Sequence, residues 1–137
     1  MLALNRLSGL ICTASLALVL FAAPANAASR GYIVNGEGWM NLSPPERVAY
    51  AQGMNDTVNF PYTNDDLDTA VVKYARTRCL LETRTAPNIL ADIITTGYTK
   101  NPQLMKQSPL YVYVVRLNEI CRTIINEERA KMGLQSF

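Results

Sequence analysis

The 137-residue chain contains no histidine. Histidine is the commonest general base near neutral pH and the commonest zinc ligand. Its absence therefore excludes the many hydrolase and zinc-enzyme active sites that depend on it. Charge is also scarce and nearly balanced, with 13 Lys and Arg against 11 Asp and Glu. There is no basic run, and nucleic acid is therefore not an expected partner.

The local motifs of common enzymes are missing as well. No glycine-rich phosphate loop follows a strand, and neither G-x-S-x-G nor S-x-x-K occurs. Glu46 with Asp56, or Asp92 with Glu119, would be candidate carboxylate pairs, but a single sequence does not show whether they meet in space. We expect a protein that is not an enzyme, with no catalytic residues and no cofactor.

Acidic residues cluster once, in the segment NDDLD. Asn64, Asp66 and Asp68 have the alternate spacing of a calcium loop. An EF-hand, however, requires glycine and glutamate at the positions that Thr69 and Ala75 occupy. Negative charge in the first turn of a helix explains the cluster better, so no metal site is expected.

The first 27 residues have the pattern of a cleaved signal peptide. Arg6 supplies the positive charge, residues 7–23 are almost wholly apolar, and an A-x-A site ends at Ala27. Cys12 follows Ile11 and lies inside the apolar run, so it is interpreted as an ordinary signal-peptide residue and not as a lipidation site. The pattern predicts a periplasmic or secreted protein without a stable membrane anchor after cleavage.

Two cysteines remain after cleavage, Cys79 and Cys121. An exported protein with two cysteines most simply pairs them in a disulfide, although a free reactive thiol is the alternative. The bond would close a loop of about 43 residues and contribute about 4 kcal/mol in the chain-entropy model.

The apolar spacing predicts an all-α, disulfide-linked bundle of about four helices, at residues 43–58, 65–81, 86–97 and 109–131. Residues 28–42, which are rich in glycine, are expected to be a flexible leader, residues 43–131 the helical domain, and residues 132–137 a C-terminal tail. Ser43 and Glu46 form a capping box at the first helix, with Pro44 at its first position. Asn64 or Asp65 is expected to begin the second helix, Thr85 to cap the third, and Gly97 to end the third.

Two apolar stripes define the faces that are expected to be buried. The stripe of the second helix consists of Leu67, Ala70, Val71, Tyr74 and Arg78 or Cys79, and the stripe of the last helix of Leu110, Val114, Leu117, Cys121 and Ile124. The run LYVYVV at 110–115 resembles a buried strand in isolation. The preceding Ser-Pro pair and the helical period favour a helix. The arginines at 76, 78 and 84 are interpreted as a solvated surface.

Aromatic residues are the remaining candidates for a binding surface, since exposed tyrosines suit protein partners. The candidates are Tyr32, Tyr62, Tyr98, Tyr111 and Tyr113, although such rings more often cover the core of a small domain. Gly53 costs about 1 kcal/mol relative to alanine in a helix interior. We therefore expect it to admit a closely packed neighbour, either Trp39 or the last helix.

The order of short segments between Gly38 and Cys121 resembles a family of small exported immunity proteins of Gram-negative bacteria. These proteins neutralise peptidoglycan-amidase effectors of the type VI secretion system (Tai-type, or resistance-associated-protein type). The segments are GWMNLS at 38–43, RVAYAQGMND at 47–56, RCL at 78–80, PNILADII at 87–94, YTKNP at 98–102 and LNEICR at 117–122. Some members carry another cysteine in the first helical region, and this chain does not.

The resemblance implies a mostly helical periplasmic protein, without catalytic activity, that occludes an amidase and is compatible with a homodimer. Trp39, Tyr50, Gly53 and Asp56 match the shared pattern and are interpreted as structural residues. The main alternative is a periplasmic stress chaperone of the HdeA type, whose characteristic cysteine near the start of the mature domain is absent here. A structural component of the envelope is a third interpretation.

Overall fold

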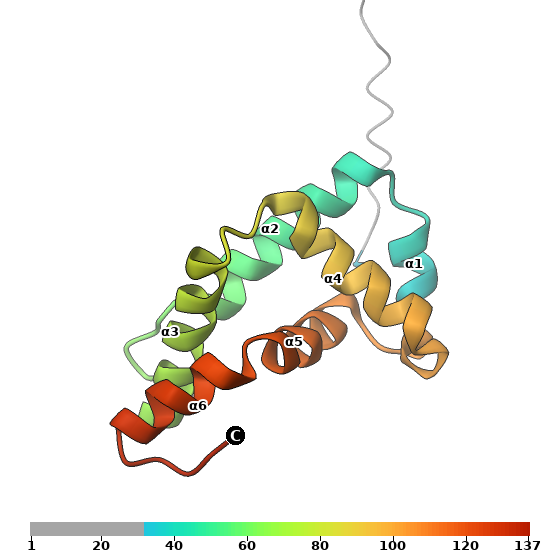
Figure 1. Ribbon diagram of the computed structural model, residues 1–137. Helices are drawn as coiled ribbons and strands as arrows, with labels where there is room; N and C mark the ends of the chain where they lie inside the picture. The colour runs from blue at the N-terminus through green and yellow to red at the C-terminus, as the bar shows by residue number, and fades with distance from the viewer. Residues whose placement is uncertain (1–31) are drawn as a thin grey trace, which may run out of the picture. The chain divides into compact units, whose positions relative to one another are not determined.

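The computed structural model describes residues 32–137, and the predicted signal peptide lies outside this part. The described chain is all-α, as expected, and contains one disulfide (Figure 1). It has six α-helices instead of four. They are α1 (Gly36–Met40), α2 (Pro44–Asn59), α3 (Leu67–Glu82), α4 (Pro87–Lys100), α5 (Pro109–Ile120) and α6 (Arg122–Lys131), with a 3-10 helix, η1 (Pro102–Lys106), between α4 and α5.

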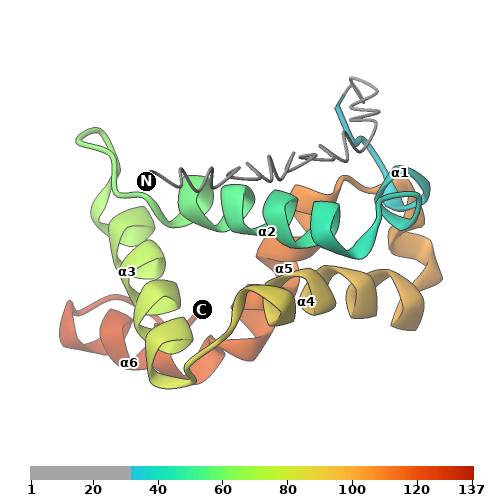
Figure 2. The ribbon, with the colours of Figure 1, turned by 90° about the horizontal axis from the view of Figure 1, so that it is seen from above.

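The helices pack mainly in three pairs, α2 with α4, α4 with α5, and α3 with α6. Figure 2 shows α2 running beside α4, and α3 beside α6. Most of the buried apolar side chains of the described residues form one cluster, so the core is continuous. Its members are Trp39, Leu42, Ala51, Val72, Ala75, Cys79, Leu90, Ala91, Ile94, Tyr98, Val112, Tyr113, Leu117, Cys121 and Ile125.

The segment expected to be a flexible leader contributes a helix and part of this core. Asn35 caps α1 by accepting a hydrogen bond from the Gly38 N–H at 2.9 Å, and Trp39 and Leu42 are buried. A Cβ atom on Gly36 would lie 2.9 Å from the ring of Tyr98, so this glycine permits close packing. The expectation of a mobile leader is therefore wrong for residues 36–42.

The expected long last helix is divided at Cys121. This residue has φ −93° and ψ 7°, outside the α-helical region, and α5 and α6 take different directions on either side of it (Figure 1). Its N–H still donates to Leu117 O, and its carbonyl accepts from the Ile125 N–H, each at 2.9 Å. The chain therefore bends at the disulfide and keeps the helical hydrogen bonds on both sides.

The buried face of α3 is only partly the expected one, since Val71 and Cys79 are buried, as predicted. Leu67 and Tyr74, expected inside, are 55% and 61% exposed, whereas Val72 and Ala75 are buried. In the last helix, Leu117 and Cys121 are buried, as predicted, but Leu110 is 45% exposed, and Val112 and Tyr113 are fully buried instead. The LYVYVV run is helical, as expected.

The ends of the middle helices also differ from expectation. Asp66, one or two residues later than expected, caps α3 by accepting from the Thr69 N–H at 2.7 Å, and Ala86, instead of Thr85, precedes α4. Gly97 does not end α4. It lies inside the helix, where a Cβ atom would be 2.5 Å from Val112 Cγ1, so it serves the close contact between α4 and α5.

Candidate functional site

The segment around Trp39 and α2 is positioned by the predicted cap. The Glu46 carboxylate accepts hydrogen bonds from the backbone N–H and the hydroxyl of Ser43, both at 2.7 Å, and Pro44 occupies the first helical position. Arg47 then donates back to the carbonyl oxygens of Met40 at 2.7 Å and Leu42 at 3.1 Å. These bonds hold α1 against the beginning of α2 and fix the direction of the α2 side chains.

Trp39 belongs to the hydrophobic core. It is fully buried, and its indole N–H donates to Thr95 Oγ1 at 3.0 Å. The ring of Tyr50 meets it edge to face, with the centroids 6.2 Å apart. Trp39 therefore joins α1 to α4 and places Tyr50 at the border between the core and the surface.

Gly53 does not admit a close neighbour. No heavy atom lies within 4 Å of the position that a Cβ atom would occupy. The glycine lies in an open, mostly apolar groove of about 300 Å³ between α2 and the beginning of α5, lined by Tyr50, Gly53, Met54, Thr57 and Leu110. The expectation that Trp39 or the last helix packs on Gly53 is therefore wrong, and the glycine widens a surface feature.

Asp56, the last residue of the shared pattern, is exposed, and its Oδ1 accepts a hydrogen bond from Asn55 Nδ2 at 3.4 Å. Two of the other carboxylates considered in the sequence have separate contacts. Glu46 belongs to the cap, and Glu119 pairs with Arg116 on α5.

Sequence reasoning missed the groove because it assigned Leu110 to the core. Tyr111, the next residue, is 49% exposed, so the first turn of α5 presents two large apolar side chains to solvent. The signal for the groove in the sequence was Gly53, because a glycine in a helix interior lowers stability and therefore needs an explanation.

The disulfide joins Cys79 of α3 to Cys121, with a Cα–Cα distance of 5.7 Å, as predicted. Both cysteines are buried, which places the bond inside the core.

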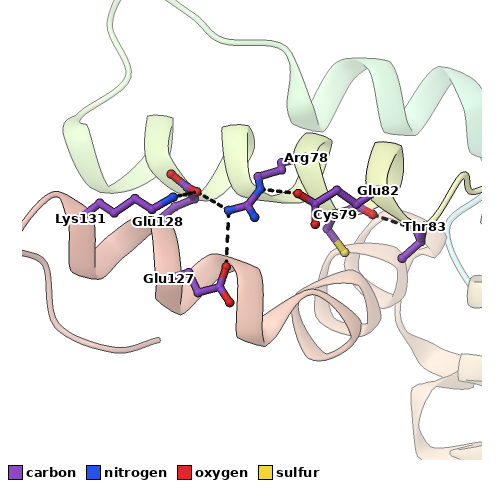
Figure 3. A network of polar contacts seen from close by, with 7 residues as sticks. All are labelled: Arg78, Cys79, Glu82, Thr83, Glu127, Glu128 and Lys131. Atoms are coloured by element: carbon purple, nitrogen blue, oxygen red, sulfur yellow. Dashed lines mark hydrogen bonds and ion pairs between the residues drawn. The ribbon is translucent and has the colours of Figure 1, made fainter.

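An ion-pair network crosses from α3 to α6 beside the disulfide (Figure 3). Arg78 Nη1 contacts Glu128 Oε1 at 2.5 Å and Glu127 Oε2 at 3.4 Å, and its Nε donates to Glu82 Oε1 at 2.6 Å. Lys131 Nζ also reaches Glu128 at 2.7 Å, and this bond is the main reason why the pKa of Glu128 is lowered. The expectation of a solvated surface is wrong for Arg76, which is buried, and for Arg78, which connects two helices.

The five candidate tyrosines divide into two groups. Tyr98 and Tyr113 are core residues, whose hydroxyls donate to Gln107 O at 2.9 Å and Asn55 Oδ1 at 2.8 Å. Burial raises the pKa of Tyr98 to about 12. The other three, Tyr32, Tyr62 and Tyr111, are exposed.

Within residues 32–137, no group of three or more carboxylate or thiol side chains is placed to hold a metal ion, and no helix is long and apolar enough to cross a membrane. Comparison of the chain with protein-family models, curated proteins and solved structures finds no match.

Proposed function

We propose that this chain is an exported, non-catalytic helical protein that binds a protein partner, and that the partner is a peptidoglycan amidase whose cleft it covers. The amidase as partner rests on the resemblance of the chain between Gly38 and Cys121 to the immunity proteins. The groove around Gly53 is the proposed contact surface on this chain.

The observation that carries the groove assignment is the position of Gly53. Glycine in the middle of a helix lowers stability by about 1 kcal/mol relative to alanine. Gly36 and Gly97 each avoid a steric overlap with a neighbouring side chain, but Gly53 avoids none, since nothing lies within 4 Å of its Cβ position. Its effect is on the surface, where it leaves room between Tyr50, Thr57 and Leu110.

The surroundings of Gly53 suit a protein partner. The groove is mostly apolar, and Leu110 lines its α5 side with 45% of its surface exposed. Apolar and aromatic side chains of this kind provide the central contacts of many interfaces, because they bury a large area with little loss of side-chain entropy. A side chain of the partner would enter over Gly53, and α2 would lie across the amidase cleft.

The partner is tested by capture from an envelope extract of the source organism on the mature, oxidised chain. We expect a peptidoglycan amidase to be retained and its hydrolysis of peptidoglycan to be inhibited. Retention of other envelope proteins without an amidase contradicts the immunity proposal. Suppression of aggregation at low pH without amidase binding supports the chaperone alternative.

The groove is tested by filling it. Gly53→Leu is expected to weaken amidase binding by at least about tenfold, which corresponds to about 1.4 kcal/mol, as measured by calorimetry. Gln52→Ala is the matched control, because Gln52 is exposed on the same helix and does not line the groove. Equal affinity of Gly53→Leu and wild type would place the contact elsewhere on the molecule.

A further inference from the structure

A second cleft, separate from the Gly53 groove, lies along α3. It has a volume of about 200 Å³ and is lined by Asp68, Thr69, Val72, Lys73, Arg76 and Phe137. Four of these residues, at 69, 72, 73 and 76, recur at the spacing of a single helix face, so α3 forms one wall of the cleft. Phe137, from the C-terminal segment, also lines the cleft.

The unusual member of this cleft is Arg76. It is 8% exposed, and its Nε donates to Asn118 Oδ1 at 2.7 Å. That neutral amide is its one hydrogen-bond partner among the described residues, and no carboxylate of this part of the chain lies at ion-pair distance from it. A buried charge without a partner of opposite sign is costly, which is why buried arginines are usually paired.

The carboxylate that lines the cleft and the one that contacts Lys73 are both paired with other cations. Both oxygens of Asp65 accept from Lys73 Nζ, at 2.9 and 2.7 Å, and Asp68 pairs with Arg129. Each of these pairs has no net charge, so the positive charge of Arg76 is not compensated within the lining of the cleft. Burial also lowers the pKa of Arg76, as expected for a cation that lacks a counter-ion.

The free edge of the guanidinium defines the ligand chemistry. The Nε–H of Arg76 donates to Asn118, so Nη1 and Nη2 of Arg76 are left to donate two parallel hydrogen bonds along their shared edge. This fork matches a planar carboxylate or a phosphate. A water molecule takes roughly 30 Å³ in the liquid, so the cleft has room for such an anion and part of its hydration shell.

We propose that the cleft along α3 is a binding site for a small oxyanion, a carboxylate or a phosphate, with Arg76 as its charged ligand. The site goes beyond the proposed binding of a protein partner and does not depend on it. It lies on α3, whereas the groove around Gly53 lies between α2 and α5.

The test uses the oxidised chain at neutral pH, titrated with sodium phosphate or sodium acetate against sodium chloride of equal ionic strength. We expect the unfolding midpoint to rise and saturate at millimolar anion for phosphate, acetate or both, and the NMR signal of the Arg76 Nε–H to move over the same concentrations. A rise that stays linear, as expected from general salt exclusion, contradicts the proposal. An unmoved Arg76 signal contradicts it too.

Two arginine variants complete the test. Arg76→Met is expected to weaken the apparent anion affinity at least tenfold. Arg122→Met is the matched control and is expected to leave the affinity unchanged, because Arg122 is exposed on α6 and has no ion-pair partner in the described chain. Equal saturable rises in both variants would overturn the proposal. If Arg76→Met does not fold, the wild-type NMR titration decides the outcome alone.

Discussion

At the scale of single residues, three glycines in this protein have three different surroundings. A Cβ atom on Gly36 would lie 2.6 Å from Met105 Sδ, and one on Gly97 would lie 2.5 Å from Val112 Cγ1, whereas one on Gly53 would meet nothing within 4 Å. The sequence shows the cost of each glycine but not what faces it. The sequence therefore predicts close packing at Gly53, whereas the structure shows close packing at Gly36 and Gly97.

Alanine substitutions should separate these roles. Gly53→Ala is expected to raise the free energy of unfolding by about 0.5–1 kcal/mol, because it gains helix propensity without a clash. Gly97→Ala is expected to lower it by about 1–2 kcal/mol, because overlap with the stiff, buried side chain of Val112 outweighs the same gain. Urea unfolding measures both changes, and a loss of stability in Gly53→Ala would be inconsistent with an open groove.

A second residue-scale feature is Arg84, the one described non-glycine residue with a positive φ, 49°. It follows the end of α3, where the Thr85 N–H donates to Leu80 O at 2.9 Å and the Arg84 N–H to Leu81 O at 3.1 Å. This is the Schellman pattern, which favours glycine at the position of Arg84. Gly133 occupies the equivalent position after α6, with φ 70°.

Arg84→Gly is therefore expected to stabilise the protein. Relief of the left-handed backbone conformation is worth about 1–2 kcal/mol and exceeds the entropic cost of glycine, about 0.5–1 kcal/mol. The net gain of about 0.5–1 kcal/mol should raise the melting temperature by several degrees. Arg84→Ala keeps the left-handed conformation and serves as the control. A gain of equal size in Arg84→Ala would show that removal of the side chain, and not the backbone, is responsible.

At the scale of helices, the sequence correctly predicts that the chain is helical and where several of the helices begin. Proline after a small or polar residue starts α2, α4 and α5, and these local signals depend on nothing distant in the chain. The face that each helix buries was less predictable. Helix α3 has apolar residues on two sides. Leu67 and Tyr74 are exposed, and Val72 and Ala75 are buried. The position of α6 determines which of the two sides is buried, and the sequence of α3 does not show that position.

The division between α5 and α6 also depended on tertiary structure. No proline or glycine marks residue 121, and the helical pattern continues across it. The bend coincides with the disulfide to Cys79, a partner that is 42 residues away in the sequence. The groove at Gly53 was missed for a related reason, since its second wall is Leu110 of α5.

Removal of the disulfide should test its role between these elements. The Cys79→Ala/Cys121→Ala variant is expected to lose about 2–4 kcal/mol of stability, because the bond closes a long loop and its removal also takes buried sulfur atoms from the core. Thermal unfolding with and without a reductant measures the loss. Reduced wild type and the double variant should agree, and an unchanged midpoint after reduction would refute a stabilising role.

At the scale of the whole molecule, ion pairs hold distant parts of the chain together. Lys73 binds Asp65 in the segment before α3, Arg78 joins α3 to α6, and Arg129 of α6 pairs with Asp68. Arg129 Nε also donates to Gln135 O at 2.6 Å, and its guanidinium lies 5.7 Å from the centre of the Phe137 ring. The C-terminal segment, expected to be a tail, therefore folds back onto α6.

These pairs make stability sensitive to acid. The pKa of Asp65 is lowered mainly by its hydrogen bond from Lys73. The pKa of Asp66 is lowered mainly by the hydrogen bond from the backbone N–H of Thr69. The pKa of Glu128 is lowered mainly by its hydrogen bond from Lys131. A carboxyl group whose pKa is lower in the folded state contributes its stability above the unfolded pKa, about 4, and loses it as the pH falls through the folded value.

The expected profile of stability is therefore flat between about pH 5 and 8, because the chain has no histidine to titrate there, and falls below about pH 4. Thermal unfolding at constant ionic strength measures it. Lys73→Met is the informative variant, since Asp65 then lacks its main partner and the acid-induced loss should become smaller. A midpoint that changes near neutral pH, or an acid-induced loss of equal size in Lys73→Met, would show that other groups control the response.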